Sequence, residues 1–146
     1  MVRYDPALFG RIFEAENSVL VTEEMIGDFC RAIGETNPLY IDFEAAKSAF
    51  GAVVAPPSFA ATFRGGDNIF QHVHRYGHAG LAAGMDVEFV APIRAGDSIR
   101  MLSQLTQSYE KTGRSGPMIF VVIRTTLKNQ RGETVAHIDH RFMNRP

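Results

Sequence analysis

Apolar residues recur at every second position in the C-terminal half of this chain, from Gly80 onward. Met85 and Phe89, for example, are separated by Asp86 and Glu88. Alternation of this kind is typical of antiparallel strands that bury one face and expose the other. Further strands, separated by turns that contain glycine or proline, are predicted at Ile99 to Leu105, Met118 to Ile123 and Val135 to Phe142. The preceding residues are therefore expected to supply the layer that covers the buried face of a sheet.

Short helices are predicted in the N-terminal half. Thr22 is a suitable N-cap for the first helix, and Gly34 is placed to end it. The apolar residues between them recur at helical spacing, which predicts that Cys30 is a core residue. The alternative, a nucleophilic thiol, has no histidine or basic partner nearby in the sequence. Asp42 can cap a second helix from Phe43 to about Phe50.

A longer helix is predicted to begin near Pro57. Gly65-Gly66 interrupts its pattern at a cost of about 1 kcal/mol per glycine relative to alanine, so either the helix breaks there or another backbone approaches it closely. The chain is therefore predicted to be one α+β domain over residues 1–146, with its core at about 10–143. In this fold an antiparallel sheet wraps around a long central helix. The buried face of that helix is predicted to hold Phe59, Phe63, Ile69, Phe70 and Val73.

Composition excludes several classes of function. The formal net charge is -1, and the basic residues are scattered, so a nucleic-acid partner is not expected. Cys30 is the only cysteine, which rules out an intramolecular disulfide and fits a reducing compartment. No apolar run approaches the roughly 18 to 20 residues of a membrane span, and the first residues lack the apolar core of a signal peptide. The sequence therefore predicts a cytoplasmic protein with no membrane partner.

The histidines do not form a metal-binding pattern. His74 and His78 would share a helix face only if the helix continued between them, and no third ligand follows at a recognisable spacing. On the last predicted strand, alternation places His140 on the apolar side, as a core or dimer-interface residue, and His137 on the polar side. No metal and no other cofactor is therefore expected.

The stretch from Gly34 to Tyr40 is the first place to expect chemistry. It holds a carboxylate, an amide and a phenol, at Glu35, Asn37 and Tyr40. Asn37 precedes Pro38, a dipeptide that commonly opens a turn. Each of the three side chains also has a structural interpretation: a solvated or capping carboxylate, a turn-forming asparagine and a ring packed over the junction between two helices.

This stretch resembles the MaoC-like hot-dog family, which includes type 2 (R-specific) enoyl-CoA hydratases and (3R)-hydroxyacyl-thioester dehydratases. The family pattern is Gly-Asp-x-Asn-Pro-x-His, followed after five residues by Ala or Ser, and the chain matches it at Gly34, Asn37, Pro38 and Ala46. The segment Phe89 to Asp97 is similar to the strand and turn that follow the central helix in this family. The resemblance covers about residues 10 to 143 and implies a hot-dog fold.

The resemblance implies a set of site residues. In the family, an aspartate and a histidine add or remove water next to a thioester carbonyl by general acid-base catalysis. Here Glu35 and Tyr40 stand at those positions, so these two residues and Asn37 are the catalytic candidates. The family also places a backbone N–H at the start of the central helix. Pro56-Pro57 cannot supply it, and the candidates for contacting substrate around the helix start are Ser58, Phe59 and Phe63.

Three functions follow from this resemblance. The first is a (3R)-hydroxyacyl-thioester dehydratase or trans-2-enoyl-thioester hydratase acting on acyl-CoA or an acyl carrier protein. The second is a catalytically silent, acyl-binding subunit of the N-terminal MaoC-like dehydratase subgroup, whose partner carries the aspartate and histidine. A hot-dog thioesterase is the third. A homodimer or a heterodimer with a second MaoC-like chain is expected. Two interpretations are open for four cations, either contact with the phosphates of coenzyme A or a carrier-protein arm, or a merely solvated face: Arg64, Lys111, Arg114 and Lys128.

Overall fold

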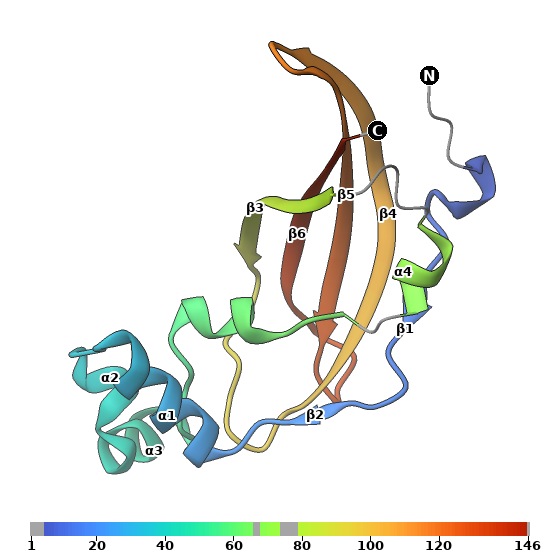
Figure 1. The fold of residues 1–146 in the computed structure, drawn as a ribbon. Helices are drawn as coiled ribbons and strands as arrows, with labels where there is room; N and C mark the ends of the chain where they lie inside the picture. Colours follow the sequence, from blue (N-terminus) through green and yellow to red (C-terminus); the bar gives the residue numbers. More distant parts are fainter. Residues whose placement is uncertain (1–4, 66–67, 74–78, 146) are drawn as a thin grey trace.

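The computed structural model describes residues 5–65, 68–73 and 79–145 (Figure 1). Helices come first along the chain and long strands last. In order, the elements are η1 (Pro6–Leu8), β1 (Phe13–Glu14), β2 (Val19–Leu20), α1 (Glu23–Ile33), α2 (Pro38–Ile41), α3 (Phe43–Phe50), η2 (Pro57–Thr62), α4 (Asn68–His72), β3 (Ala79–Phe89), β4 (Ser98–Gly113), β5 (Gly116–Lys128) and β6 (Thr134–Arg145).

The strands form one antiparallel, 6-stranded sheet in the order β1-β4-β5-β6-β3, with β2 also paired to β4. Strands β4, β5 and β6 are consecutive neighbours, as the predicted meander requires. Strand β3 instead pairs with β6 and lies at the edge of the sheet. The segment 90–97 therefore runs from the edge strand β3 to β4, and part of it forms one wall of a pocket. The predicted antiparallel α+β architecture is confirmed.

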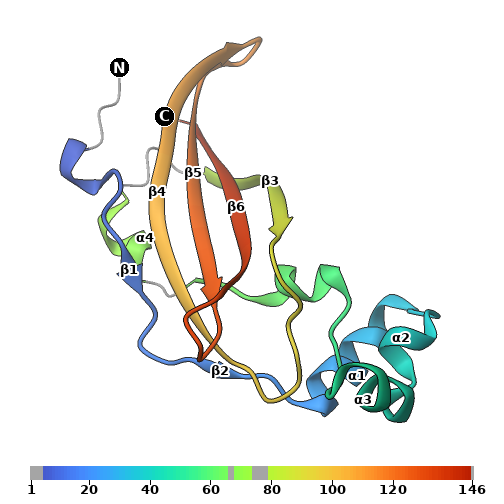
Figure 2. The same cartoon turned by 180° about the vertical axis from the view of Figure 1, so that it is seen from behind.

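The N-terminal helices begin and end where their capping residues predict. The Thr22 hydroxyl accepts a hydrogen bond from the Met25 N–H at 3.1 Å, and Gly34 ends α1 with a φ of 68°. The Asp42 carboxylate caps α3 by accepting a hydrogen bond from the Ala45 N–H at 3.0 Å. Helices α1, α2 and α3 lie together beside one end of the sheet (Figures 1 and 2).

The expectation of a long central helix is wrong. The 3-10 helix η2 crosses one face of the sheet and contacts β3 and β6, whereas the short α4 covers the same face near β1 and β4 (Figures 1 and 2). Between them, Gly65 lies directly on the sheet. A Cβ atom at this position would overlap the Ser103 hydroxyl and come within 2.8 Å of the Thr125 hydroxyl oxygen. The backbone thus approaches the strands more closely than a helix carrying side chains can. Gly66 lies outside the described residues.

The buried residues form separate groups on either side of this contact. One group packs around η2 and the helices, and the other lies under α4. Cys30 belongs to the first group and is 3% exposed, as its helical spacing predicts. None of the helices in the described ranges has both the length and the apolar composition needed to cross a bilayer.

We predict that Gly65→Ala lowers the free energy of unfolding by about 1–3 kcal/mol, because the new methyl group must displace a strand or its hydroxyl pair. Equilibrium urea unfolding, followed by circular dichroism, measures the change. Gly27→Ala in α1 is the matched control: its Cβ has only ordinary contacts, so up to about 1 kcal/mol of stabilisation is expected there. Adding Ser103→Ala to Gly65→Ala should recover part of the loss. Equal effects at both glycines would contradict the close-approach account.

Candidate active site

The Gly34–Tyr40 turn is held by its own polar side chains. One carboxylate oxygen of Glu35, Oε1, accepts hydrogen bonds from the backbone N–H groups of Thr36 and Asn37, both at 2.9 Å. The Asn37 side-chain oxygen accepts the Leu39 N–H at 3.0 Å and so caps α2. Both polar groups therefore satisfy backbone donors that the turn and the helix end leave open.

Tyr40 is partly buried and packs against the core group around η2. Its carbonyl oxygen accepts a weak hydrogen bond from the Cys30 thiol, with the sulfur 3.7 Å away. Burial raises the pKa of Cys30, and the nearby negative charge of Glu35 raises it further. The thiol is thus kept protonated at neutral pH, which makes Cys30 a structural residue rather than a nucleophile.

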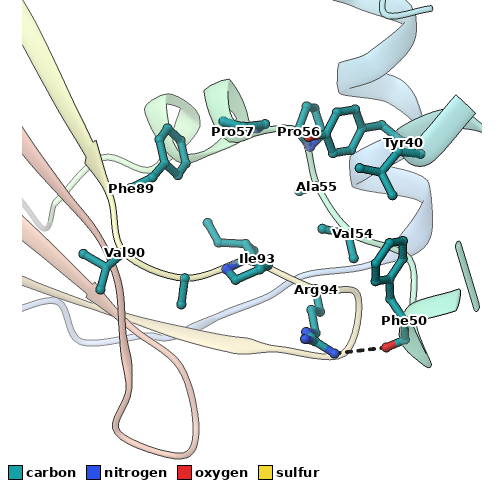
Figure 3. A pocket seen from close by; sticks show the side chains of 13 residues that line it. Tyr40, Phe50, Val54, Ala55, Pro56, Pro57, Phe89, Val90, Ile93 and Arg94 are labelled. Carbon is teal, nitrogen blue, oxygen red and sulfur yellow. Dashed lines mark hydrogen bonds between the residues drawn. The ribbon is translucent and has the colours of Figure 1, made fainter. Parts of the chain in front are cut away.

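A pocket of about 340 Å³ opens beside the Tyr40 ring (Figure 3). We call it the Tyr40 pocket. Figure 3 shows Tyr40 next to Pro56 on one side, Phe89 across from them, and Phe50 near Arg94 at the opposite rim. Its lining is almost entirely apolar: Leu39, Tyr40, Phe50, Val54, Ala55, Pro56, Pro57, Phe89, Val90, Ala91, Pro92, Ile93 and Arg94.

Two extended segments that are distant in sequence build the pocket wall. The Ala55 N–H donates to the Ile93 carbonyl and the Ala95 N–H donates to the Val53 carbonyl, both at 2.9 Å. This pairing brings the residues that precede η2 against the crossing that follows β3. The Arg94 guanidinium then reaches the Phe50 carbonyl at the end of α3, at 3.1 Å (Figure 3). No ion pair to Arg94 is formed within the described residues.

The predicted catalytic residues do not all meet in this pocket. Tyr40 lines it together with Pro56 and Pro57, the residues at the start of the central segment. Glu35 instead borders a separate depression of about 550 Å³ on the side of α1, which Tyr40 also lines. Asn37 lines neither of them. Of the predicted catalytic residues, only Tyr40 lines both the pocket and the depression that Glu35 borders.

The residues predicted to contact substrate differ in their exposure to solvent. Ser58 is exposed on η2, whereas Phe59 and Phe63 are 2% and 4% exposed and belong to the core. The ring of Phe59 makes edge contacts with Phe29 and with Phe63, at centroid distances of 5.4 and 5.6 Å. None of the three lines the Tyr40 pocket. Their contact with a substrate stays a prediction, as does catalysis by Glu35, Tyr40 and Asn37.

Of the residues that line this pocket, only Tyr40 was among the predicted site residues, and those missed include Phe50, Phe89 and Arg94. Phe50 ends α3 and Phe89 ends β3, and both are about half-exposed, at 47% and 44%. The available sequence signal was an aromatic residue at the expected end of a helix and of a strand; its exposure follows only from the structure. Arg94 lies inside the Pro92-to-Asp97 turn, where composition alone marks only a turn. The cations singled out from the sequence, including Lys111, do not line this pocket.

No histidine of the described residues lines the Tyr40 pocket or the depression beside Glu35. The rings of His72 and Phe13 are tilted against each other at 5.0 Å, and His137 hydrogen-bonds the Thr126 hydroxyl at 3.0 Å. His140 lies on β6, and burial lowers its pKa, with a further contribution from Arg64. His74 and His78 lie outside the described residues. No group of three or more histidine, cysteine, aspartate or glutamate side chains among the described residues could hold a metal ion.

Comparison with known proteins decides the family. A family model described as the FAS1-like, dehydratase domain region matches residues 7–138. The chain belongs to this family. The resemblance to MaoC-like hot-dog dehydratases at the Gly34–Tyr40 turn is thereby confirmed at the level of the family.

Relatives of this chain include proteins described only by a family number. A UPF0336 protein of Parafrankia sp. is 35% identical over 138 residues, with 75% of this chain and 84% of that protein covered. A UPF0336 protein of Streptomyces avermitilis is 29% identical over 136 residues, which cover 90% of this chain and 88% of that protein. A probable enoyl-CoA hydratase alpha subunit of Thermomonospora curvata is 31% identical and matches 80% of this chain, but only 42% of its own length.

Solved structures of the family share the fold. A MaoC-like dehydratase superposes on 94% of this chain with a TM-score of 0.78 and 24% identity, over 42% of that chain. The (3R)-hydroxyacyl-ACP dehydratase HadBC of Mycobacterium tuberculosis covers 93% of this chain and 97% of its own, with a TM-score of 0.70 and 24% identity. At these identities the likeness extends to the fold alone.

We predict that Asn37→Ala destabilises the family turn by about 1 kcal/mol, because the Leu39 N–H loses its cap. Asn37→Asp should keep most of the stability, since a carboxylate caps equally well. Urea unfolding measures the global effect, and faster amide exchange at Leu39 reports the local one. Asn17→Ala, at an exposed asparagine without a side-chain hydrogen bond in the described part of the chain, is the control. A loss of stability in Asn17→Ala as large as that in Asn37→Ala would contradict the capping role of Asn37.

Proposed function

We propose that this chain is an acyl-thioester-binding subunit of a (3R)-hydroxyacyl-thioester dehydratase, and that it pairs with a second MaoC-like chain that carries the catalytic aspartate and histidine. The observation that carries the proposal is the hydrogen bonding of Glu35. Its Oε1 atom already accepts two backbone N–H groups of the turn, and Tyr40 occupies the position of the family histidine.

The chemistry of the two replacements supports a silent site. Glutamate carries its carboxylate one methylene further from the backbone than aspartate does, and a displacement of about 1 Å can cost about a hundredfold in rate. For a tyrosine to act as a base near pH 7, its pKa would have to fall from about 10 to 7, which takes roughly 4 kcal/mol of differential stabilisation. Neither Glu35 nor Tyr40 is therefore suited to the acid-base role of the family pair.

The Tyr40 pocket is suited to binding rather than to proton transfer. Its walls are aliphatic, aromatic and proline side chains, and its only charged lining residue among those described is Arg94. An apolar pocket of about 340 Å³ with one cation at its rim matches the general form of a small-molecule site. In the proposed complex it would take part of the acyl thioester, with Arg94 available to an anionic or carbonyl group.

The edge of the sheet supports a partner chain. Strand β3 pairs with β6 on one side and with no strand of the described residues on the other. Leu81, Met85 and Phe89 along this edge are 53%, 45% and 44% exposed. A long edge strand with exposed apolar side chains is a template for pairing with another strand. We infer that a second MaoC-like chain covers it.

Relatives with paired subunits motivate the choice of partner. Structures that share the fold include the HadBC complex and the ChsH1-ChsH2 complex of Mycobacterium tuberculosis, the second with a TM-score of 0.67. The enoyl-CoA hydratase relative of Thermomonospora curvata is described as an alpha subunit. Carried to this chain, these descriptions favour a heterodimer over a homodimer.

One observation favours a second candidate, a self-sufficient enoyl-thioester hydratase. Only Oε1 of Glu35 is engaged by the turn, whereas Oε2 accepts no hydrogen bond within the described residues. A carboxylate with one free oxygen retains proton-transfer capacity. In this alternative, a substrate would approach Glu35 through the depression on the α1 side of Tyr40.

We predict that the purified chain alone does not consume crotonyl-CoA, measured as loss of the enoyl absorbance, and that Glu35→Gln changes nothing. Coexpression with a MaoC-like chain that has Asp and His at the matching positions should give a complex more active than that partner alone. Turnover by this chain by itself, abolished in Glu35→Gln, would instead establish the second candidate.

The sheet edge provides the control for this experiment. Met85→Lys places a charge on the exposed edge strand and should abolish the gain in activity by preventing pairing. Leu20→Lys changes an apolar residue on β2 that is 60% exposed, against 45% for Met85, and should leave the gain intact. Sedimentation of each mixture separates loss of pairing from loss of folding.

A further inference from the structure

Rings make up much of the lining of the Tyr40 pocket. Three of its lining side chains are aromatic, those of Tyr40, Phe50 and Phe89, and three are prolines: Pro56, Pro57 and Pro92. The other apolar members are alanines, β-branched residues and a single leucine, and the described lining contains no methionine. The walls are therefore built mainly from side chains that have few rotamers.

The aromatic rings border the pocket on two sides. Figure 3 shows Tyr40 beside Pro56 on one wall and Phe89 on the wall across from them. Phe89 is 44% exposed, so its ring is open to a ligand rather than covered by core side chains. Aromatic groups pack edge to face or offset-stacked, and these contacts add to the gain from apolar burial. An aryl group that enters between Tyr40 and Phe89 can make such contacts with both walls.

The pocket has room for a phenyl ring. Its volume is about 340 Å³. An apolar cavity of about 150 Å³ is enough to hold one benzene molecule. The remaining space suits the short chain that joins a ring to a thioester carbonyl.

Backbone hydrogen bonds hold the wall between β3 and β4 in place. The N–H groups of Val90 and Ala91 both donate to the Val135 carbonyl, at 3.0 and 3.1 Å. Further along, the Arg94 N–H donates to the Asp97 carboxylate at 2.9 Å, and Asp97 is only 2% exposed. A pocket fixed in this way loses little conformational entropy when it binds a rigid group. It adapts poorly to the many conformations of an alkyl chain.

We propose that the Tyr40 pocket prefers an acyl group that carries an aryl ring to a linear acyl group with the same number of carbons, and that the rings of Tyr40 and Phe89 hold the aryl ring from two sides. This inference rests on the proposed function, because it takes the ligand to be an acyl thioester, and it narrows the substrate class of that site. Apolar area alone predicts the opposite order, since the free linear chain exposes more apolar surface to water.

The test is direct binding of hydrocinnamoyl-CoA and nonanoyl-CoA to the full chain, with isotopically labelled isoleucine and valine methyl groups. The two acyl groups have equal numbers of carbons and are saturated, so neither can be hydrated. Hydrocinnamoyl-CoA should bind at least about threefold more tightly. The ring current of its phenyl group should shift the methyl resonances of Val54 and Ile93. Those of Ile69 and Ile123, which line a separate pocket under α4, should stay in place.

The outcomes separate this inference from the proposed function. Equal affinities, tighter binding of nonanoyl-CoA, or shifts confined to Ile69 and Ile123 would overturn the ring preference and leave thioester binding intact. If neither thioester binds, the proposed function fails together with this inference. Unacylated coenzyme A is the control for contacts outside the acyl group. Shifts of Val54 and Ile93 as large with coenzyme A as with hydrocinnamoyl-CoA would also refute the assignment.

Substitution of a single ring locates the preference. Phe89→Leu should bring the two affinities to about parity, while the affinity for nonanoyl-CoA changes by less than about twofold. Phe70→Leu is the matched control, because Phe70 is 37% exposed and lies on α4, outside the Tyr40 pocket. Both rings are partly exposed, so both variants are expected to fold, and circular dichroism checks this. An equal loss of preference in the two variants would refute the role of Phe89.

Discussion

The close approach of the Gly65 backbone to the Ser103–Thr125 hydroxyl pair is the constraint on which much of this structure depends. It prevents a continuous helix from covering this face of the sheet, because no side chain fits between the Gly65 backbone and the strands. The covering layer is therefore split into η2 on one side and α4 on the other. The split leaves room between η2 and α4, on the face of the sheet that they cover. A pocket of about 630 Å³, lined by Ile69, Ile123 and Phe142 among others, lies there.

The Gly34–Tyr40 turn separates two properties that usually occur together in an active site. Gly34, Asn37 and Pro38 retain the backbone geometry that joins α1 to α2. Glu35 uses one carboxylate oxygen to hold that geometry, and Tyr40 lines both the apolar pocket and the depression that Glu35 borders. The family turn is thus kept as an architectural element, while the groups that would move protons are replaced. A binding role follows more directly from this arrangement than a catalytic one.

Local signals in the sequence predicted the helices well, because their ends are set by neighbouring residues. Thr22 and Asp42 cap helices by bonding donors three positions along, and a left-handed Gly34 ends α1. The long central helix was predicted wrongly, since the periodicity around Gly65 contains no information about the strand hydroxyls that it touches. The pairing of β3 with β6 is likewise nonlocal, because it joins strands that other strands separate in the sequence.

The candidate site also combines local features, which the sequence predicts, with nonlocal features, which it does not. The structure places Tyr40 in one pocket with Pro56 and Pro57, at the start of the central segment, whereas its catalytic role stays a prediction. The orientation of Glu35 depends on which donors its side chain reaches, and a motif does not specify this. Arg94 was missed because its position follows from the pairing of Val53–Ala55 with Ile93–Ala95, which only the folded chain reveals.

The most direct test of a binding subunit that lacks catalysis is deuterium incorporation in D2O. Hydration of an enoyl thioester adds a solvent deuteron to C2 of the 3-hydroxyacyl product, and dehydration at the same site removes that same deuteron. The label is therefore sought at C2 of the 3-hydroxydecanoyl thioester, where mass spectrometry detects small amounts of product. With trans-2-decenoyl-CoA and this chain alone, the account predicts broadened thioester proton resonances, which report binding, and no deuterium at C2 by mass spectrometry. Deuterium at C2 with the wild-type chain alone, absent with Glu35→Gln, would contradict it.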